Sequence, residues 1–430
     1  MQKLKVIILA HEFSPSLGSE CAVGWNIASR LSRYHDVTVI YARNNHFNTS
    51  NYKEDVDIFL QENKIPGLKT VSISQPFIAR LIAQINIKLS FSKSGIGLAP
   101  LFFLAYKIWQ RRAYKEVRRL IMAEHFDLVH QLTAISFRSP GYLYKTELPL
   151  VWGPCSGLVK IPSTFYKSLP LKSIVFEVFR RISNYLQSNC SIMVIKTLKR
   201  ASVIYAVTND DYTFFVKKSS CIVKQMLDVG TYPNFSDFTP IYRNSTKLRI
   251  LWIGRFVYSK AFNLLIDSIL ISPEKFDAVE IIVIGDGPLM DKYKMSVEQK
   301  KLSMFRWMGN LPHNDVLKLI QSSDLLVHTS IKEATSAVIL EALTYGLPVI
   351  CHDAFGMGIA INETCGIKIP LIDPETSIRG FYDAMAYLID NRELIIKLKK
   401  GAIKRAEELS WDSNAEKIAE DYIKIIANNF

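Results

Sequence analysis

Cysteine is scarce in this sequence, and the few cysteines are not spaced for metal binding or redox chemistry. No two are separated by only two residues, so neither a zinc cluster nor a dithiol pair is indicated. A chain of this length forms a core without disulfides, and we expect a reducing, cytoplasmic environment. The six cysteines are Cys21, Cys155, Cys190, Cys221, Cys351 and Cys365.

Long apolar runs are also missing. No stretch reaches the roughly 18 uninterrupted apolar residues that span a bilayer. The best candidate, Ile96–Trp109, is shorter and contains Pro100 and Lys107. The N-terminal apolar run is too short for a signal peptide, because His11 and Glu12 end it. We therefore expect neither a transmembrane helix nor a secretion signal.

Acidic residues are scarce in two segments of the chain, which as a whole carries a net charge of +13. Phe77–Ile121 contains nine Lys or Arg and one acid, and Lys160–Arg200 contains eight and one. Both segments mix bases with large apolar residues, a combination that suits an anionic membrane surface. We expect peripheral attachment to the inner face of the cytoplasmic membrane; two solvated basic helix faces are the alternative. No pattern indicates nucleic-acid binding.

Strand and helix patterns alternate along most of the chain. The segments KLKVIILA, AVGWNIASRLSRY and HDVTVIYA predict a βαβ unit. An irregular polar segment around Thr231–Ser245 reads as a linker, and the alternation resumes at LRILWIG. This pattern predicts an α/β protein with two tandem doubly wound parallel sheets facing a cleft. The expected domains are residues 1–230 and 246–410.

Ligands of doubly wound sheets bind outside the carboxyl ends of the strands. LRILWIG ends at Gly254, and Arg255 and, five positions later, Lys260 follow it. The glycine lets the chain leave the strand tightly, and the two cations suit a diphosphate. Two solvated loop bases are the alternative.

The next two strand ends give weaker signals. Gly285 ends EIIVIG, and glycine at this position permits either close backbone approach to a ligand or a tight turn. Asn310 and Leu311 follow FRWMG, where the backbone is placed to face a base or a ribose.

The most informative strand end follows LLVHTS. Glu333 lies in the predicted loop, and Glu341 lies about one and a half turns into the next helix. The small residues Ala334, Thr335 and Ser336 let helix amides approach a phosphate. Glu341 is suited to accept hydrogen bonds from a ribose diol, and Glu333 from sugar hydroxyls. A capping acid and an exposed helix glutamate are the alternative.

The N-terminal half offers two further candidates. Gly18 and Ser19 precede Glu20 at the start of a predicted helix, where backbone amides suit a phosphate. The spacing is not GxGxxG, which argues against a dinucleotide site. His130 ends a predicted strand, where it is either a substrate contact or a structural histidine.

A metal-binding constellation is not evident, because no DxD motif follows a predicted strand directly. We expect no metal or other cofactor. The leaving-group charge would then be stabilised by Arg255, Lys260 and helix amides.

With these residues placed, the chain resembles the retaining glycosyltransferases of family 4, which have the GT-B fold. The resemblance runs through nearly the whole chain and is strongest from Ile250 to Ile369. The motifs that carry it are G-S-E at Gly18–Glu20, G-R-x4-K at Gly254–Lys260, G-D-G-P at Gly285–Pro288 and E-x7-E at Glu333–Glu341.

The resemblance implies roles for the candidate residues. Arg255 and Lys260 would bind the donor diphosphate, Glu341 the ribose and Glu333 the transferred sugar. Small-for-small departures, such as E-A-T-S after Glu333 in place of E-G-F-G and Ala261 in place of glycine, leave the choice of UDP- or GDP-sugar open.

For the N-terminal half, the resemblance implies that Gly18 faces the phosphates and that His130 touches the sugar. Residues 1–230 would bind the acceptor, 246–410 would bind the nucleotide sugar, and a last helix, 411–430, would cross back to the first domain.

The expected function is retaining transfer of a hexosyl unit from a nucleoside-diphosphate sugar to a lipid-linked or growing surface polysaccharide. The expected catalytic residues are Glu333, His130, Arg255 and Lys260. A sugar-nucleotide epimerase with a similar double sheet, or a non-catalytic membrane-associated assembly protein, is the alternative.

Overall fold

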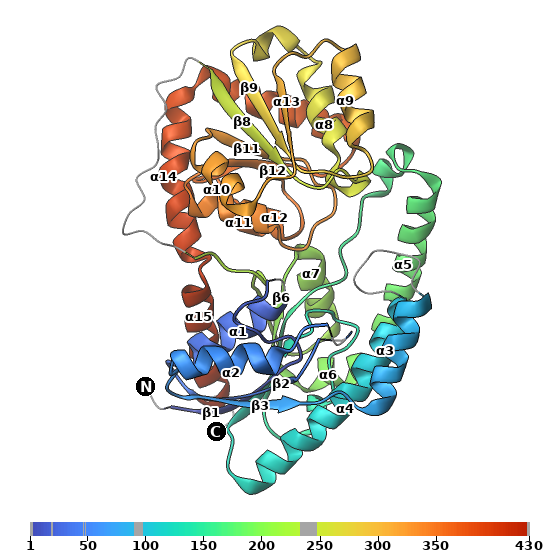
Figure 1. The fold of residues 1–430 in the computed structure, drawn as a ribbon, viewed down its shortest axis with the longest axis vertical. Coiled ribbons are helices and arrows are strands. Elements are labelled where there is room, and N and C mark those ends of the chain that lie inside the picture. Colours follow the sequence, from blue (N-terminus) through green and yellow to red (C-terminus); the bar gives the residue numbers. More distant parts are fainter. Residues whose placement is uncertain are drawn as a thin grey trace.

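The computed structural model describes residues 3–18, 20–45, 47, 49–89, 98–232 and 247–427. Figure 1 shows two α/β units stacked along the long axis of the molecule, each built around a parallel sheet. The lower unit contains the N-terminal half together with the last helix, and the upper unit contains most of the C-terminal half.

The lower unit has a seven-stranded parallel sheet in the order β3-β2-β1-β4-β5-β6-β7. The strand order reverses beside β1, which pairs with both β2 and β4, as in a doubly wound sheet. Its strands are β1 (Lys5–Ala10), β2 (Asp36–Ala42), β3 (Leu68–Ile73), β4 (Leu128–Thr133), β5 (Leu150–Cys155), β6 (Ala201–Ala206) and β7 (Ile222–Gln225). Its helices are α1 (Glu20–Leu31), α2 (Tyr52–Glu62), α3 (Phe77–Leu89), α4 (Ala99–Ala123), α5 (Leu171–Cys190), α6 (Ile192–Arg200) and α7 (Asn209–Lys218).

The upper unit has a six-stranded parallel sheet in the order β10-β9-β8-β11-β12-β13. Its strands are β8 (Leu248–Ile253), β9 (Val279–Ile284), β10 (Phe305–Gly309), β11 (Leu325–His328), β12 (Val349–His352) and β13 (Gly366–Ile369). The helices are α8 (Phe262–Ile269), α9 (Met290–Gln299), α10 (His313–Gln321), α11 (Ala337–Thr344), α12 (Phe355–Ala360), α13 (Pro374–Asp390) and α14 (Arg392–Glu408), followed by α15 (Trp411–Ala427).

Continuous apolar runs explain the central strands. In β1 (KVIILA) every residue after the first is buried, because helices cover both faces of the sheet. The prediction of two doubly wound parallel sheets is confirmed. The short strands β7 (IVKQ) and β13 (GIKI) were not predicted, since neither has a long apolar run.

Two segments link the units. Helix α15 packs on α1, and its Ile418 and Tyr422 lie in the core of the lower unit. In the opposite direction, Ile161, Phe165 and Leu169, which precede α5, lie in a core of the upper unit. Most of the predicted linker, from residue 233 on, lies outside the described residues, as do residue 246 and the last three residues of the predicted 411–430 helix.

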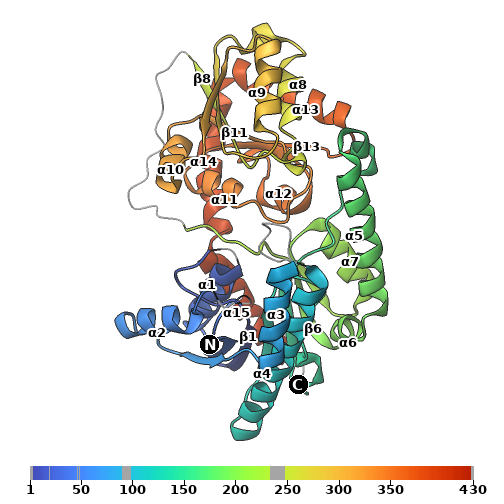
Figure 2. The ribbon, with the colours of Figure 1, turned by 45° about the vertical axis from the view of Figure 1, so that its right-hand side comes forward.

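Figures 1 and 2 both place α3, α4 and α5 along one side of the molecule, with α5 rising towards the upper unit. These helices contain most of the two basic, apolar segments of the sequence. Among the described residues, no helix is long and apolar enough to cross a membrane.

Candidate active site between the two sheets

An ion pair between Lys260 and Glu333 lies at the carboxyl edge of the upper sheet. Lys260 closes the loop after β8, and Glu333 lies in the loop after β11. Ser330 Oγ donates to Glu333 Oε2 at 3.3 Å, and His328 Nε2 lies 3.7 Å from the same oxygen. Burial raises the pKa of Glu333, but His328 and Lys260 outweigh burial and lower this pKa to about 2. Glu333 is therefore a fixed, ionised acceptor.

Hydrogen bonds hold these two loops together. The Ile331 amide donates to the Ser259 carbonyl at 2.9 Å, and the Thr329 hydroxyl donates to the Lys260 carbonyl at 2.7 Å. The Trp252 indole, from β8, donates to the Thr329 hydroxyl at 3.0 Å. The ion pair is thus preorganised by backbone contacts and does not depend on the side chains alone.

Gly285 permits close packing of two loops. Its φ is +128°, and a Cβ there would lie 2.0 Å from the carbonyl oxygen of Gly254. The loops after β8 and β9 therefore touch each other at glycine. This contact explains Gly285 structurally, whereas a Cβ on Gly254 would lie 3.1 Å from the Trp252 ring. The expected role of both glycines in donor binding stays a prediction.

Arg255 belongs to the same sequence motif as Lys260, and Glu341 to the same motif as Glu333, but neither side chain takes part in the Lys260–Glu333 ion pair. Arg255 is exposed, and its side chain forms no ion pair with any described residue. Glu341, on α11, is partly exposed, and its Oε1 lies 3.0 Å from His313 Nε2 of α10. Both side chains are accessible to a ligand at the carboxyl edge.

The remaining residues predicted after β10 and β11 surround this edge. Asn310 is exposed, whereas Leu311 packs against an apolar core of the upper unit. Ser336 is the N-cap residue of α11, and its side chain makes no capping hydrogen bond. The Ala334 carbonyl accepts from the Gly356 amide at 2.8 Å. Buried Thr335 Oγ1 has no hydrogen-bond partner among the described residues.

The lower sheet presents carboxylates that the sequence analysis did not identify as site residues. Glu12 follows β1, Glu20 begins α1, and Asp228 follows β7. Burial and the charges of Glu12 and Asp228 raise the pKa of Glu20 to about 8. Burial raises the pKa of Asp228, and the charge of Glu333 adds to this effect. Ala334, next to Glu333, packs against the core of the lower unit, so the carboxyl edges of the two sheets face each other. The clustering of these three carboxylates depends on tertiary structure, and no local sequence motif predicts it.

Within this cluster, His11 offsets the burial of Glu12. His11 Nδ1 lies 2.7 Å from Glu12 Oε1. Burial raises the pKa of Glu12, but the charge and hydrogen bond of His11, together with hydrogen bonds from the Glu12 amide and Thr133, lower it overall. One buried oxygen each of Glu12 and Asp228 lacks a hydrogen-bond partner among the described residues, although buried polar atoms are normally paired.

Gly18 lies beside this cluster, two positions before Glu20. A Cβ on Gly18 would meet no atom within 4 Å, so the backbone here borders open space. Ser19, the other predicted residue of this loop, lies outside the described residues.

His130 requires a correction. The sequence analysis placed it at the end of a strand, but β4 continues to Thr133, and the ring is fully buried. Its Nδ1 lies 2.5 Å from Tyr422 Oη, and its Nε2 lies 2.6 Å from the Gly153 carbonyl oxygen. Burial lowers the pKa of His130 to about 4. Both ring nitrogens thus have partners within the protein, and the expected contact with the sugar stays a prediction.

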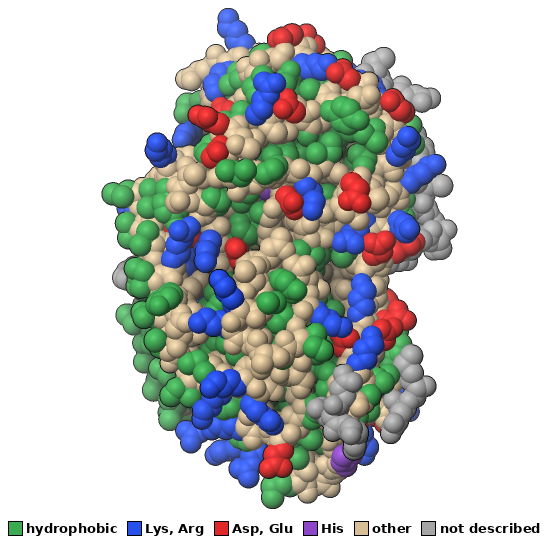
Figure 3. Space-filling model, turned by 180° about the vertical axis from the view of Figure 1, so that it is seen from behind, with side chains coloured by type: hydrophobic (Ala, Val, Ile, Leu, Met, Phe, Trp, Pro, Cys, Tyr) green, Lys and Arg blue, Asp and Glu red, His purple; other side chains and the backbone are tan. Residues whose placement is uncertain are grey.

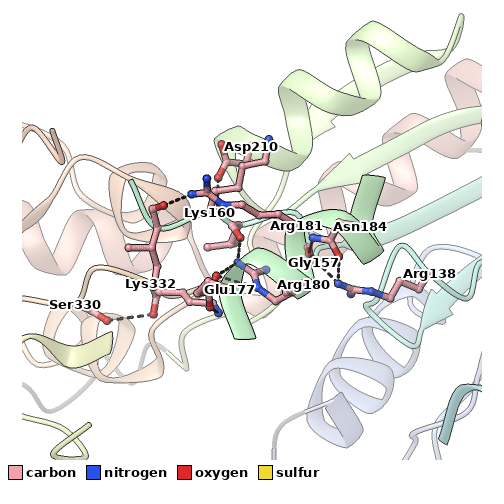
Figure 4. A network of polar contacts seen from close by, with 12 residues as sticks. Arg138, Gly157, Lys160, Glu177, Arg180, Arg181, Asn184, Asp210, Ser330 and Lys332 are labelled. Atoms are coloured by element: carbon pink, nitrogen blue, oxygen red, sulfur yellow. Dashed lines mark hydrogen bonds and ion pairs between the residues drawn. The ribbon is translucent and has the colours of Figure 1, made fainter. Parts of the chain in front are cut away.

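A network of polar contacts connects the units beside Glu333 (Figure 4). Lys332 forms an ion pair with Glu177 of α5, which also accepts from Arg180 Nη2 at 2.7 Å. Burial raises the pKa of Glu177, and hydrogen bonds from Arg180 and Lys332 outweigh burial and lower it. The ion pair thus joins the α5 side of the cleft to the loop that carries Glu333.

The cleft between the units contains a cavity of about 730 Å³. Its lining comes from both sides and includes Gly157, Lys172, Phe176, Tyr258, Lys332 and Glu333. The volume is in the range of small-molecule sites. Among the described residues, no group of His, Cys, Asp or Glu side chains is arranged to hold a metal ion.

Comparison with known proteins fits this architecture. Two Rossmann-like units that face each other across a cleft define the GT-B fold. The solved structure of WaaG, a glycosyltransferase involved in lipopolysaccharide biosynthesis, aligns with a TM-score of 0.56 at 18% identity over 97% of this chain and 99% of that one. Anabaena Alr3699/HepE in complex with UDP aligns with a TM-score of 0.56 at 16% identity, over 98% of this chain and 100% of that one.

The family model of glycosyl transferases group 1 matches residues 236–406. A curated relative from Escherichia coli, UDP-Gal:alpha-D-GlcNAc-diphosphoundecaprenol alpha-1,3-galactosyltransferase, is 28% identical over 345 residues, which are 72% of this chain and 78% of the relative. Matches to several other curated glycosyltransferases span less than half of their lengths. The chain is therefore similar to glycosyltransferases of group 1 over residues 236–406, and its fold is that of the solved GT-B structures.

Proposed function

We propose that this protein transfers a hexosyl unit from a nucleoside-diphosphate sugar, with retention, to a lipid-linked acceptor or a growing surface polysaccharide. The observation that carries the proposal is the Lys260–Glu333 ion pair, fixed at the carboxyl edge of one sheet and facing the carboxylates of the other. This arrangement offers a cation to a phosphate and ionised oxygens to sugar hydroxyls.

In the proposed donor complex, Arg255 and Lys260 bind the diphosphate. The charge that develops on the leaving group is then stabilised by fixed cations and helix amides. Glu341 accepts hydrogen bonds from the ribose, and Glu333 accepts them from the transferred sugar. A phosphate bound to Lys260 would weaken the ion pair between Lys260 and Glu333. Donor binding would thus free Glu333 to accept hydrogen bonds from the sugar.

The acceptor assignment is supported by the curated Escherichia coli relative, whose name specifies a UDP-Gal donor and a diphosphoundecaprenol-linked acceptor. It is also supported by the basic, apolar helices on one side of the molecule. We propose that this side rests on the inner face of the cytoplasmic membrane, where anionic lipids attract Lys and Arg.

The test is incubation with a panel of labelled UDP- and GDP-sugars, with and without membrane lipid. The proposal expects label to move from the nucleotide to a lipid fraction only when acceptor lipid is present. The anomeric configuration of the product, read by NMR, tests retention. Label that stays on the nucleotide and changes epimer would show an epimerase instead, and no turnover of any sugar nucleotide would contradict both enzymes.

A further inference from the structure

Helix α5 is amphipathic in the reverse of the usual sense. Its buried residues are polar, namely Glu177, Asn184 and Ser188. Its exposed residues include large apolar side chains, such as Leu171, which is 75% exposed, and Phe179, which is 67% exposed. A surface helix normally turns its apolar stripe to the core, so this stripe has another use.

The stripe is continuous along the helix. Its members recur at helical spacing and cover about 15 residues, or roughly 23 Å. Figure 3 shows hydrophobic side chains gathered along its left edge, which corresponds to the side of α3 and α5 in Figure 1. The exposed apolar residues of α5 are Leu171, Val175, Phe176, Val178, Phe179, Ile182, Tyr185 and Leu186.

The stripe leads into the cleft. Phe176 is 61% exposed as a member of the stripe, and it also lines the cavity of about 730 Å³ that contains Glu333. Lys172 and Ser173, from the first turns of α5, line the same cavity. An apolar surface and the proposed reaction centre are therefore parts of one continuous surface.

Cations predominate where the stripe meets the cavity. The cavity lining contains three cations, Lys172, Arg180 and Lys332, and two carboxylates, Glu177 and Glu333. Figure 4 shows the network in which Arg180 and Lys332 both pair with Glu177. Arg138 forms no ion pair with any described carboxylate, although the charge of Asp211 acts on it: its guanidinium donates to the side chains of Ser136 and Asn184 and to the Gly157 carbonyl. Burial, and then the charge of Arg180, lower the pKa of Arg138 to about 10. Arg138 lies outside the cavity lining, whereas Lys172 lines the cavity and forms no ion pair with a described residue, so Lys172 is free to bind an anion there.

We propose that the apolar stripe of α5 binds the hydrocarbon chain of a polyprenyl-diphosphate acceptor, and that Lys172 with the cations around Glu177 binds its diphosphate. The inference rests on the proposed function and adds the acceptor site to it. The sugar attached to the diphosphate would then lie in the cavity beside Glu333. Tight binding of this acceptor needs both the cations and the apolar stripe, because its diphosphate and its polyprenyl chain belong to one molecule.

A comparison with helix α3 distinguishes an acceptor site on α5 from a general contact of the apolar helices with a bilayer. Helix α3 also exposes large apolar residues, including Phe77 and Leu81, and buries the small residues Ala79 and Ala83. Unlike α5, it contributes no residue to the lining of the cleft cavity. A bilayer would use both helices, whereas an acceptor bound at the cavity needs α5.

The experiment measures binding of farnesyl diphosphate by calorimetry, with the donor site saturated by UDP and without vesicles. We expect Phe179→Ser with Ile182→Ser to weaken farnesyl diphosphate about tenfold, and Lys172→Gln to weaken it by a similar factor. Ile396→Ser, at an exposed apolar residue of α14, is the matched control and should leave it unchanged. Inorganic diphosphate should respond to Lys172→Gln alone.

Two outcomes would overturn the inference. Farnesyl diphosphate that binds equally to all the α5 variants excludes this site, even if glycosyl transfer proceeds. An equal loss of farnesyl diphosphate binding in Leu81→Ser assigns α5 to the bilayer instead. So does a separate sedimentation assay with phosphatidylglycerol vesicles in which the α5 variants lose only vesicle binding. UDP affinity, measured on the same proteins, keeps the proposed function separate: a wild-type protein that binds no nucleotide contradicts that function, whatever the lipid result.

Discussion

Lys260 and Glu333 are 73 positions apart in the chain, yet they form an ion pair at the carboxyl edge of the upper sheet. A second Glu–cation pair, Arg249 with Glu280 at 2.9 Å, lies at the other edge of the same sheet, near the amino ends of the neighbouring strands β8 and β9. The two pairs have similar chemistry and different positions. Substitutions in the two ion pairs can therefore distinguish a role of the glutamate in the cleft from a role in the stability of the sheet.

Glu333→Gln should lower transfer by about 100-fold, because a neutral amide no longer balances Lys260 or accepts as strongly from the sugar. Initial rates at saturating donor and acceptor check this value. Glu280→Gln, the matched control, should leave the rate unchanged while it lowers the melting temperature slightly. Equal rate losses in both variants would mean that Glu333 acts only through folding.

Arg255→Gln should weaken UDP about tenfold and leave uridine binding unchanged, because the guanidinium is proposed to contact only the diphosphate. Calorimetric titration with UDP, UMP and uridine measures the difference. Arg306→Gln, an exposed arginine of β10 paired with Glu280, is the control and should bind all three ligands as wild type does. Weaker binding of uridine by Arg255→Gln would place this residue at the base or ribose instead.

Glu341→Gln should weaken UDP about tenfold, since a carboxylate that accepts from two ribose hydroxyls is replaced by an amide. The variant should also lose the preference of the wild type for UDP over 2′-deoxy-UDP, which a merely structural role would not affect. Competition titrations with the two nucleotides provide this comparison. Glu375→Gln, in the first turn of α13, serves as the control.

The fold was largely predictable because its cause is local. Buried parallel strands such as β1 and β8 are apolar runs, and the residues after them mark the carboxyl edge. The inside-out packing of α5 was not predictable, because its sequence is an ordinary amphipathic pattern. Only tertiary structure decides which side faces the protein.

The same reasoning applies to the site. Lys260 and Glu333 follow strand ends, so sequence alone indicated that they share one edge. Glu12, Glu20 and Asp228 converge on the cleft from separate elements, and their interaction depends on how the two units are placed. His130 was misplaced because the strand residues after it, Gln131 to Thr133, are less apolar than those before it.

His130→Phe should lower stability and leave UDP affinity unchanged. The substitution leaves the Gly153 carbonyl and the Tyr422 hydroxyl buried without their partner, at a cost of about 1–3 kcal/mol in the free energy of unfolding. Urea unfolding, together with calorimetric titration of UDP, distinguishes the two effects. A large loss of transfer at unchanged stability would support the catalytic role predicted from the sequence.

Glu20 should make stability depend on pH between about 4.5 and 8. Its pKa is about 8 in the folded protein, against 4.5 for a free side chain. In this range the folded state keeps a proton that the unfolded state has lost, so the free energy of unfolding falls as pH rises. Glu20→Gln has no proton to lose. Its stability relative to wild type should therefore rise from pH 5 to pH 8 and level off above, as urea unfolding at each pH can show.

The same titration bears on the donor. At pH 7 a neutral Glu20 does not repel a diphosphate near Gly18, but above pH 8 its carboxylate does. UDP should therefore bind wild type more weakly as pH rises through 8, whereas Glu20→Gln should keep its affinity. Glu62→Gln, at the end of α2, is the control for both measurements and should follow wild type. A parallel fall in affinity for all three proteins would assign the change to another group and place Glu20 away from the phosphates.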